Sequence, residues 1–165
     1  MILVIGFGNT LRRDDGAGAA LARLVSRSLP EGAVCCREVP LLVPELAEEI
    51  AQPAVAGVIF CDVRPPGNDG EESVRVTRLA AAPPHAPLGH LLAPESLLAI
   101  AATLYGFVAP AWLVTVAGRD FGHGEGLSEP VRHALGQAEG VLADVLQECL
   151  KASRAAVSST GSLPA

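Results

Sequence analysis

Residues 1–23 read MILVIGFGNTLRRDDGAGAALAR. A short apolar run, Ile2 to Ile5, is followed directly by glycines, which predicts a buried strand that ends in a tight loop. After Asp14 and Asp15, apolar residues recur at helical spacing, and either carboxylate can cap a helix by accepting from its free first-turn amides. Strand, glycine loop and helix open an α/β sheet protein, which binds ligands at the carboxyl ends of its strands. The two aspartates are therefore expected where a ligand would bind.

The glycine loop does not complete a dinucleotide-binding fingerprint. In the stretch that starts at Gly6, Leu11 stands where the third glycine is required. The helix that would hold a pyrophosphate also begins with two carboxylates, which repel a polyanion and favour a cation. A nucleotide-binding α/β domain is therefore the disfavoured alternative. The plainest alternative is that one aspartate only caps the helix and the other is solvated.

A second carboxylate position comes from a later strand. Residues 54–61 read AVAGVIFC, a nearly continuous apolar run, and Asp62 follows before a turn rich in proline. In βαβα order the strands run parallel, so their carboxyl ends meet at one edge of the sheet. We therefore expect Asp62 and Asp15 to project into the same crevice.

The opening stretch resembles a motif of the hydrogenase maturation endopeptidases, GxGNxLxxDxxxG followed by a helix. The matching residues are Gly6, Gly8, Asn9, Leu11, Asp14 and Gly18. Members of this family remove the carboxyl-terminal extension from the large subunit of nickel-iron hydrogenases after nickel has been inserted. The resemblance extends from about Ile2 to about Leu150. It implies that Asp15, Asp62 and His90 contact the metal and are the candidate catalytic residues.

The resemblance also implies the cofactor and the partner. Nickel arrives with the hydrogenase large-subunit precursor, and Asp15, Asp62 and His90 recognise it there, although a surrogate divalent ion can occupy the same ligands. Two carboxylates and one imidazole suit a borderline divalent ion. The cleaving water can be activated by the metal or by a carboxylate, and the sequence does not choose between them. A metal-binding maturation chaperone without hydrolytic activity is a further alternative.

The remaining elements predict a three-layer α/β sandwich. The sheet is expected to be mostly parallel, with helices on both faces. Further strands are predicted at 33–39 and 111–117, and the alternating segment 73–79 is expected to be an edge strand that can run antiparallel. Helices are predicted at 44–51 and 95–105. A last helix is predicted to begin at Ser128, which is the candidate for its N-terminal cap.

Two loops are expected to flank the site and to form the precursor-binding surface. The first, Pro83 to His90, lies in a proline-rich segment that also contains His85, expected to be a solvated side chain. The second, Gly118 to Gly126, contains four glycines and His123, the main rival of His90 as a ligand. This second loop departs from the family, because Arg119 and Asp120 stand where many members have Gln-Pro.

Composition is consistent with one soluble enzyme domain. The chain has 165 residues, and we expect a single domain at 1–150 followed by a flexible Ala/Ser-rich tail at 151–165. A formal net charge of −6 argues against nucleic acid and anionic membranes as partners. No apolar run approaches the ~20 residues of a membrane span, no signal peptide is recognised, and four cysteines follow no pairing pattern. A cytoplasmic protein is therefore expected, of an oligomeric state that the sequence does not indicate.

Overall fold

The computed structural model describes residues 1–66, 72–82, 92–106 and 109–160. Its centre is a five-stranded sheet with the strand order β2-β1-β3-β5-β4. The strands are β1 (Ile2–Phe7), β2 (Val34–Val39), β3 (Gly57–Arg64), β4 (Val74–Leu79) and β5 (Ala111–Ala117). All neighbouring pairs are parallel except β4 with β5, which are antiparallel. The predicted mostly parallel sheet with an antiparallel edge strand is confirmed.

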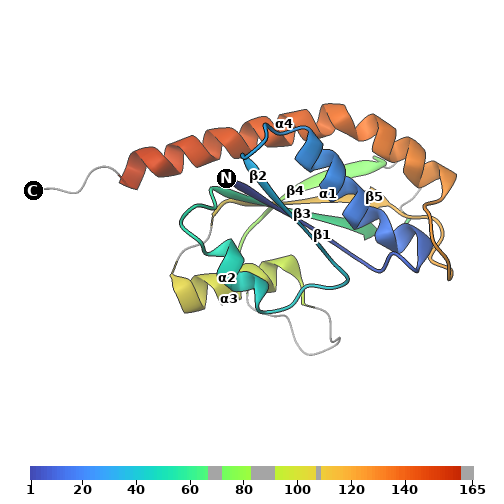
Figure 1. The fold of residues 1–165 in the computed structure, drawn as a ribbon, viewed down its shortest axis with the longest axis horizontal. Coiled ribbons are helices and arrows are strands. Elements are labelled where there is room, and N and C mark those ends of the chain that lie inside the picture. Colours follow the sequence, from blue (N-terminus) through green and yellow to red (C-terminus); the bar gives the residue numbers. More distant parts are fainter. Residues whose placement is uncertain (67–71, 83–91, 107–108, 161–165) are drawn as a thin grey trace, which may run out of the picture.

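Helices cover both faces of this sheet (Figure 1). They are the 3-10 helix η1 (Arg13–Gly16) and the α-helices α1 (Ala17–Arg27), α2 (Leu46–Ile50), α3 (Pro94–Tyr105) and α4 (Glu129–Thr160). The buried side chains of α1 and α4 belong to one apolar cluster, and those of α2 and α3 belong to a second cluster across the sheet. The predicted three-layer sandwich is thus confirmed.

The first strand is buried on both faces. Ile2 and Val4 pack into the cluster of α1 and α4, whereas Leu3 and Ile5 pack into the cluster of α2 and α3. Successive side chains of a strand point to opposite faces, so a strand covered by helices on both sides must be apolar at every position. This requirement explains the continuous apolar run that begins the chain.

Two glycines bring α1 into backbone contact with the sheet. A Cβ atom on Gly18 would lie 2.2 Å from the carbonyl oxygen of Phe7 and 2.6 Å from that of Cys61. A Cβ atom on Gly6 would lie 2.5 Å from the carbonyl oxygen of Gly18. Only residues without a side chain allow this approach. The amino end of α1, with η1 before it, is therefore held against the carboxyl ends of β1 and β3.

The last helix is longer than the sequence analysis expects. The domain was expected to end at Leu150 and a flexible tail to start at Lys151, but α4 continues to Thr160. Alanine has the highest helix propensity, so an Ala-rich segment can extend a helix that is already formed without an apolar stripe of its own. Helical conformation therefore extends past the predicted end of the domain, and residues 161–165 lie outside the described part of the chain.

The four cysteines are free thiols, as expected. Cys35 and Cys36 contact different apolar clusters, so they lie on opposite faces of β2. Cys61 and Cys149 are buried, and desolvation raises the pKa of both thiols. Protonated buried thiols of this kind are poor nucleophiles. Within the described ranges, no helix has both the length and the apolar character that crossing a membrane requires.

Candidate active site

Two carboxylates meet at one edge of the sheet. Asp15 lies in η1, directly after the loop that follows β1. Asp62 lies in the last part of β3, which ends at Arg64, so it stands near the carboxyl end of the strand as the sequence predicts. β1 and β3 are parallel neighbours, with Gly6 opposite Cys61. The expected juxtaposition of Asp15 and Asp62 at the carboxyl ends of adjacent strands is therefore present.

The pKa of Asp62 reflects its burial, a backbone hydrogen bond and the nearby charge of Asp15. Burial raises the pKa of Asp62 to about 6, the backbone amide of Val63 opposes this rise by donating to Oδ1 at 2.7 Å, and the charge of Asp15 adds to the rise. A carboxyl group with such a pKa changes its protonation state close to neutral pH. Asp62 is therefore a group of this site that titrates in the physiological range.

Asp15 does not cap a helix. Its Oδ2 accepts a hydrogen bond from the backbone amide of Asn9 at 3.0 Å. The residue before α1 is Gly16, and no side chain bonds to the first turn of that helix. The expected role of either aspartate as a cap of α1 is wrong. Both lie inside the 3-10 helix η1 that precedes α1, and the carboxylate of Asp15 bonds to the preceding loop instead.

Most backbone amides of the loop after β1 are already bonded within the protein. The amide of Asn9 donates to Asp15, and that of Leu11 donates to the Asn9 side chain at 2.9 Å. The amides of residues 12–15 donate to backbone carbonyl oxygens. Phosphate binding at a helix N-terminus needs amides that point at the ligand. The disfavoured alternative of a nucleotide-binding domain therefore gains no support from this loop.

Asp14 is fully buried, with no exposed surface, and the sequence analysis missed its function. Its Oδ2 accepts from the amides of Arg119 and Asp120 and from the hydroxyl of Ser128, each at 2.8 Å, and its Oδ1 accepts from the amide of Ser128 at 2.7 Å. Burial opposes ionisation, but these hydrogen bonds outweigh it and lower the pKa of Asp14 below its usual value. Ser128 stands before α4 as predicted, and its hydroxyl bonds to Asp14.

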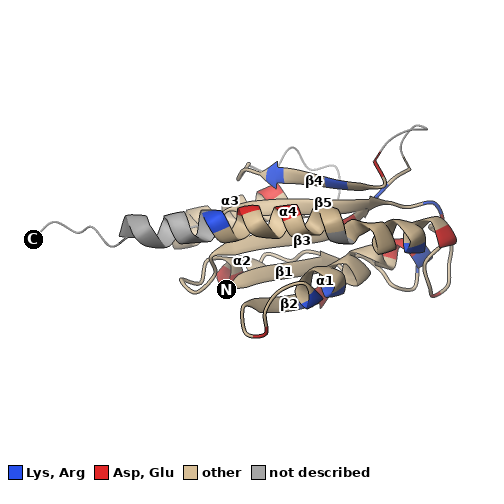
Figure 2. Cartoon of the chain, turned by 90° about the horizontal axis from the view of Figure 1, so that it is seen from above, with Lys and Arg blue, Asp and Glu red and all other residues tan. Residues whose placement is uncertain are grey.

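Further bonds join the same two loops. The amide of Arg13 donates to the carbonyl oxygen of Gly124 at 3.0 Å. The amide of Gly124 donates to the carbonyl oxygen of Leu11 at 2.9 Å. Arg13 has a positive φ of 48°, and its guanidinium lies 3.2 Å from the carboxylate of Asp120. The guanidinium of Arg12 donates to the carbonyl oxygen of Phe121 at 3.5 Å. Both arginines thus serve local contacts between the loops, and acidic and basic residues gather at this end of the molecule (Figure 2).

The structure places two of the four histidines, His123 and His133, of which His133 is exposed on α4. His85 and His90 lie outside the described residues, so their predicted roles remain predictions. His123 is exposed on the loop between β5 and α4. Among the residues that the structure describes, no three His, Cys, Asp or Glu side chains are grouped to hold a metal ion. His123, the expected rival of His90, therefore does not complete a ligand set with Asp15 and Asp62 here.

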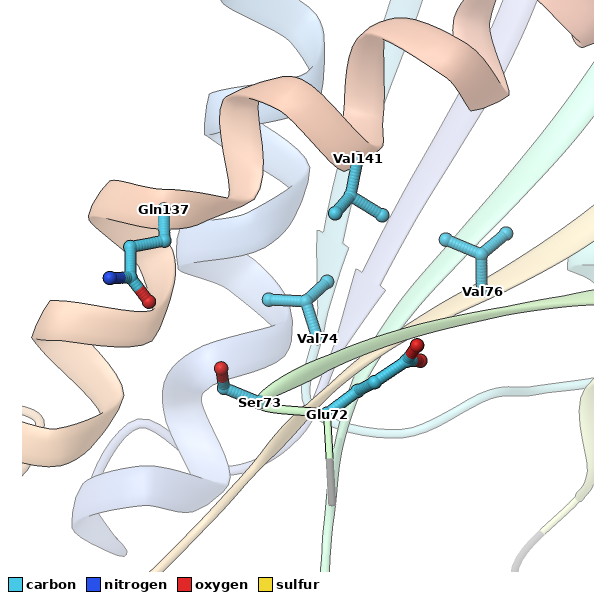
Figure 3. Close-up of a pocket in the computed structure, with 6 residues that line it drawn as sticks. All are labelled: Glu72, Ser73, Val74, Val76, Gln137 and Val141. Atoms are coloured by element: carbon cyan, nitrogen blue, oxygen red, sulfur yellow. The ribbon is translucent and has the colours of Figure 1, made fainter. Parts of the chain in front are cut away.

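A groove elsewhere on the surface contains none of these residues. It lies between β4 and α4, where Val74, Val76 and Val141 face one another (Figure 3). Glu72, Ser73 and Gln137 complete its lining. The groove lies at the edge strand β4, whereas Asp62 belongs to β3 in the middle of the sheet and Asp15 belongs to η1.

The raised pKa of Asp62 predicts a stability change that depends on pH. The native state holds the Asp62 proton more tightly than the unfolded chain, whose carboxyl has a pKa near 3.8, so this stabilisation is present below pH 3.8 and is lost as the pH rises through about 6. Asp62→Asn removes the buried charge. We expect the variant to exceed the wild type in free energy of unfolding by about 2 kcal/mol at pH 8 and to equal it at about pH 3.

Urea denaturation in the presence of EDTA measures this difference without an ion to neutralise the carboxylates. Asp144→Asn is the matched control, because Asp144 is exposed on α4 and its replacement should leave stability unchanged at both pH values. A variant at position 62 that is less stable than the wild type at pH 8 would contradict the assignment of a desolvated charge there.

Comparison with known proteins gives the fold a context. Neither a protein-family model nor a curated protein matches this sequence. Solved structures do match, among them the hydrogenase maturating endopeptidase HybD from E. coli, with 19% identity, 89% of this chain and 92% of that chain covered, and a TM-score of 0.64. The [NiFe] hydrogenase maturation protease HycI from Thermococcus kodakarensis has 21% identity, 91% and 92% coverage and a TM-score of 0.60.

A third similar structure is the hydrogenase 2 maturation peptidase from a Thaumarchaeota archaeon. It has 22% identity, covers 88% of this chain and 97% of its own, and has a TM-score of 0.58. At such identities the likeness concerns the fold, and it extends over most of both chains. This chain therefore has the fold of the hydrogenase maturation proteases, as the resemblance of its opening motif implies.

Proposed function

We propose that this chain is an endopeptidase that removes the carboxyl-terminal extension of a nickel-iron hydrogenase large-subunit precursor after nickel insertion. The observation that carries the proposal is the pair of carboxylates, Asp15 and Asp62, at adjacent strand ends in a fold shared with proteins named hydrogenase maturation proteases. The proposal includes a cytoplasmic location, since four free thiols suit a reducing compartment.

The donor set fits a nickel ion that is carried by the substrate. Burial and mutual repulsion make two charged carboxylates unfavourable at this edge of the sheet, and a cation relieves both effects. Carboxylate oxygens with an imidazole nitrogen are ligands that borderline divalent ions accept. In the proposal Asp15, Asp62 and His90 recognise the nickel, which supplies Lewis acidity and marks a completed large subunit.

Asp62 is the better placed of the two carboxylates to act as a base. With a pKa of about 6 it is mostly ionised at pH 7 and is still basic enough to accept a proton from an attacking water. The water oxygen would bond to the scissile carbonyl carbon, and the proton would pass by way of Asp62 to the leaving nitrogen as the C–N bond breaks. The amide of Asn9 holds the carboxylate of Asp15 beside this reaction.

Incubation with purified precursor tests the proposed function. The large subunit is prepared with and without nickel, incubated with the chain, and weighed by mass spectrometry. We expect the mass to fall by that of the carboxyl-terminal extension only in the nickel-loaded sample, because the metal is part of what the site recognises.

The other outcomes separate the alternatives. An unchanged mass in both samples, together with binding of the nickel-loaded precursor, would identify a metal-binding chaperone. Cleavage of both samples at the same rate would show a protease that does not recognise nickel. Unchanged masses without binding would refute the proposed function entirely.

A further inference from the structure

The loop between β5 and α4, residues 118–128, is attached to η1 by the buried side chain of Asp14. Asp14 accepts four hydrogen bonds, three from the backbone amides of Arg119, Asp120 and Ser128 and one from the Ser128 hydroxyl. Asp14 also donates its own amide to the carbonyl oxygen of Asp120 at 3.0 Å. Its immediate neighbour in η1 is Asp15. The residue that holds the loop, Asp14, is thus adjacent in the chain to Asp15, the first carboxylate of the site.

The middle of the loop is exposed to solvent, and contacts hold the loop both at its start and at Gly124. Residues 122–126 are exposed, whereas Phe121 packs against the cluster of α1 and α4. A Cβ atom on Gly118 would lie 2.5 Å from the ring of Phe121, so the ring covers the start of the loop closely. Gly124 exchanges backbone hydrogen bonds with Leu11 and Arg13. A glycine-rich segment that would otherwise sample many conformations is therefore held in one.

The register of the sheet places this segment beside the carboxylates. Thr115 of β5 lies opposite Asp62 of β3, and Ala117, which precedes the loop, lies opposite Arg64. An exposed segment that is fixed next to a reaction site loses little conformational entropy when a partner binds. Such a surface suits recognition of an extended or folded polypeptide, which contacts the enzyme well beyond the scissile bond.

We propose that Asp14 is a positioning residue that fixes residues 119–126 as a preformed part of the precursor-binding surface. The inference rests on the proposed function and deepens it, because it assigns substrate binding to a surface beside the Asp15–Asp62 pair. Asp14 acts through the loop and does not touch the reacting atoms. Its loss should therefore impair binding of the precursor more than it impairs the chemical step.

Asp14→Asn provides the main test. An asparagine side chain has one acceptor oxygen, and its amide group faces donors, so it cannot accept the bonds that the carboxylate accepts. We expect amide hydrogen exchange in peptides that cover 118–128 to accelerate about tenfold or more, with exchange in β1 and β3 unchanged. We expect KM for the nickel-loaded precursor to rise about tenfold or more, and kcat to change by less than about threefold.

Ser128 gives a second test that does not depend on the stability of the Asp14 variant. Ser128→Ala removes only the hydroxyl donor, and we expect KM to rise by about threefold, whereas Ser128→Thr keeps the hydroxyl and should restore the wild-type KM. Should Asp14→Asn fail to fold, this pair decides the matter: a rise with alanine that threonine rescues supports the proposal. Equal KM values for the wild type and both Ser128 variants would overturn it.

The failure of this inference differs from the failure of the proposed function. If the wild type does not cleave the precursor, the proposed function fails, and the inference about its substrate surface fails with it. If the wild type cleaves but Asp14→Asn lowers kcat strongly at an unchanged KM, only the inference about the loop is overturned. Asp144→Asn, an exposed carboxylate on α4, is the control and should change neither KM nor exchange in 118–128.

Discussion

Asp15→Asn and Asp62→Asn are each expected to lower cleavage of the nickel-loaded precursor by about 1,000-fold. The amide side chain keeps the size of the carboxylate, and in both cases its oxygen can still accept the backbone hydrogen bond, from Asn9 or from Val63. What is lost is the negative charge that orients a cation and accepts a proton, and removing a general base alone costs about 10² to 10⁴ in rate. The rate is measured under single-turnover conditions with excess enzyme.

Thermal unfolding of both variants checks that the loss is chemical. Each is expected to unfold cooperatively, and Asp62→Asn should be the more stable of the two at pH 8 for the reason given above. The kcat/KM of the wild type should rise as the pH increases through about 6, because Asp62 of the free enzyme must be ionised to receive the cation. Full activity in either variant would show that the reaction uses other residues.

Gly18→Ala is expected to destabilise the protein by about 3 kcal/mol, the largest stability change among the substitutions considered. The added Cβ would lie 2.2 Å and 2.6 Å from two backbone carbonyl oxygens, neither of which can rotate away. Relief requires α1 to move from the sheet, and overpacking of this kind costs about 1–3 kcal/mol or more. Because η1 precedes α1, the same movement separates Asp15 from Asp62 and should also reduce cleavage.

Gly140→Ala is the matched control for this prediction. Gly140 lies within α4, and a Cβ atom there would meet no heavy atom within 4 Å. The substitution should therefore stabilise the protein by about 0.5–1 kcal/mol through helix propensity alone. Chemical denaturation of both variants gives the comparison. Equal stability of Gly18→Ala and the wild type would refute the close packing of α1 on β1 and β3.

Much of the fold could be predicted because its signals are local. The apolar run at 111–117 coincides with β5, and the alternation at 73–79 marks β4 as an edge strand with one wet face. The carboxyl-end rule for parallel sheets predicts that Asp15 and Asp62 lie near one another. These features follow from burial and chain direction, which a sequence of this kind displays directly.

The role of Asp14 could not be predicted, because its partners are distant in sequence. Arg119 and Ser128 lie 105 and 114 residues further along the chain, and nothing near Asp14 indicates that their amides converge on it. A carboxylate before a helix has a local interpretation as a cap, and that interpretation was wrong here. The buried aspartate of the opening motif thus obtains its role from tertiary structure alone.

The most direct test of the central claim is a crystal structure of the protein with Ni²⁺, with data collected at the nickel absorption edge. The account predicts one anomalous peak bound by a carboxylate oxygen of Asp15, a carboxylate oxygen of Asp62 and a ring nitrogen of His90, each at about 2 Å. A nickel ion bound elsewhere, with His90 too far from the two carboxylates to share it, would contradict the claim that these three side chains form one metal-recognising site.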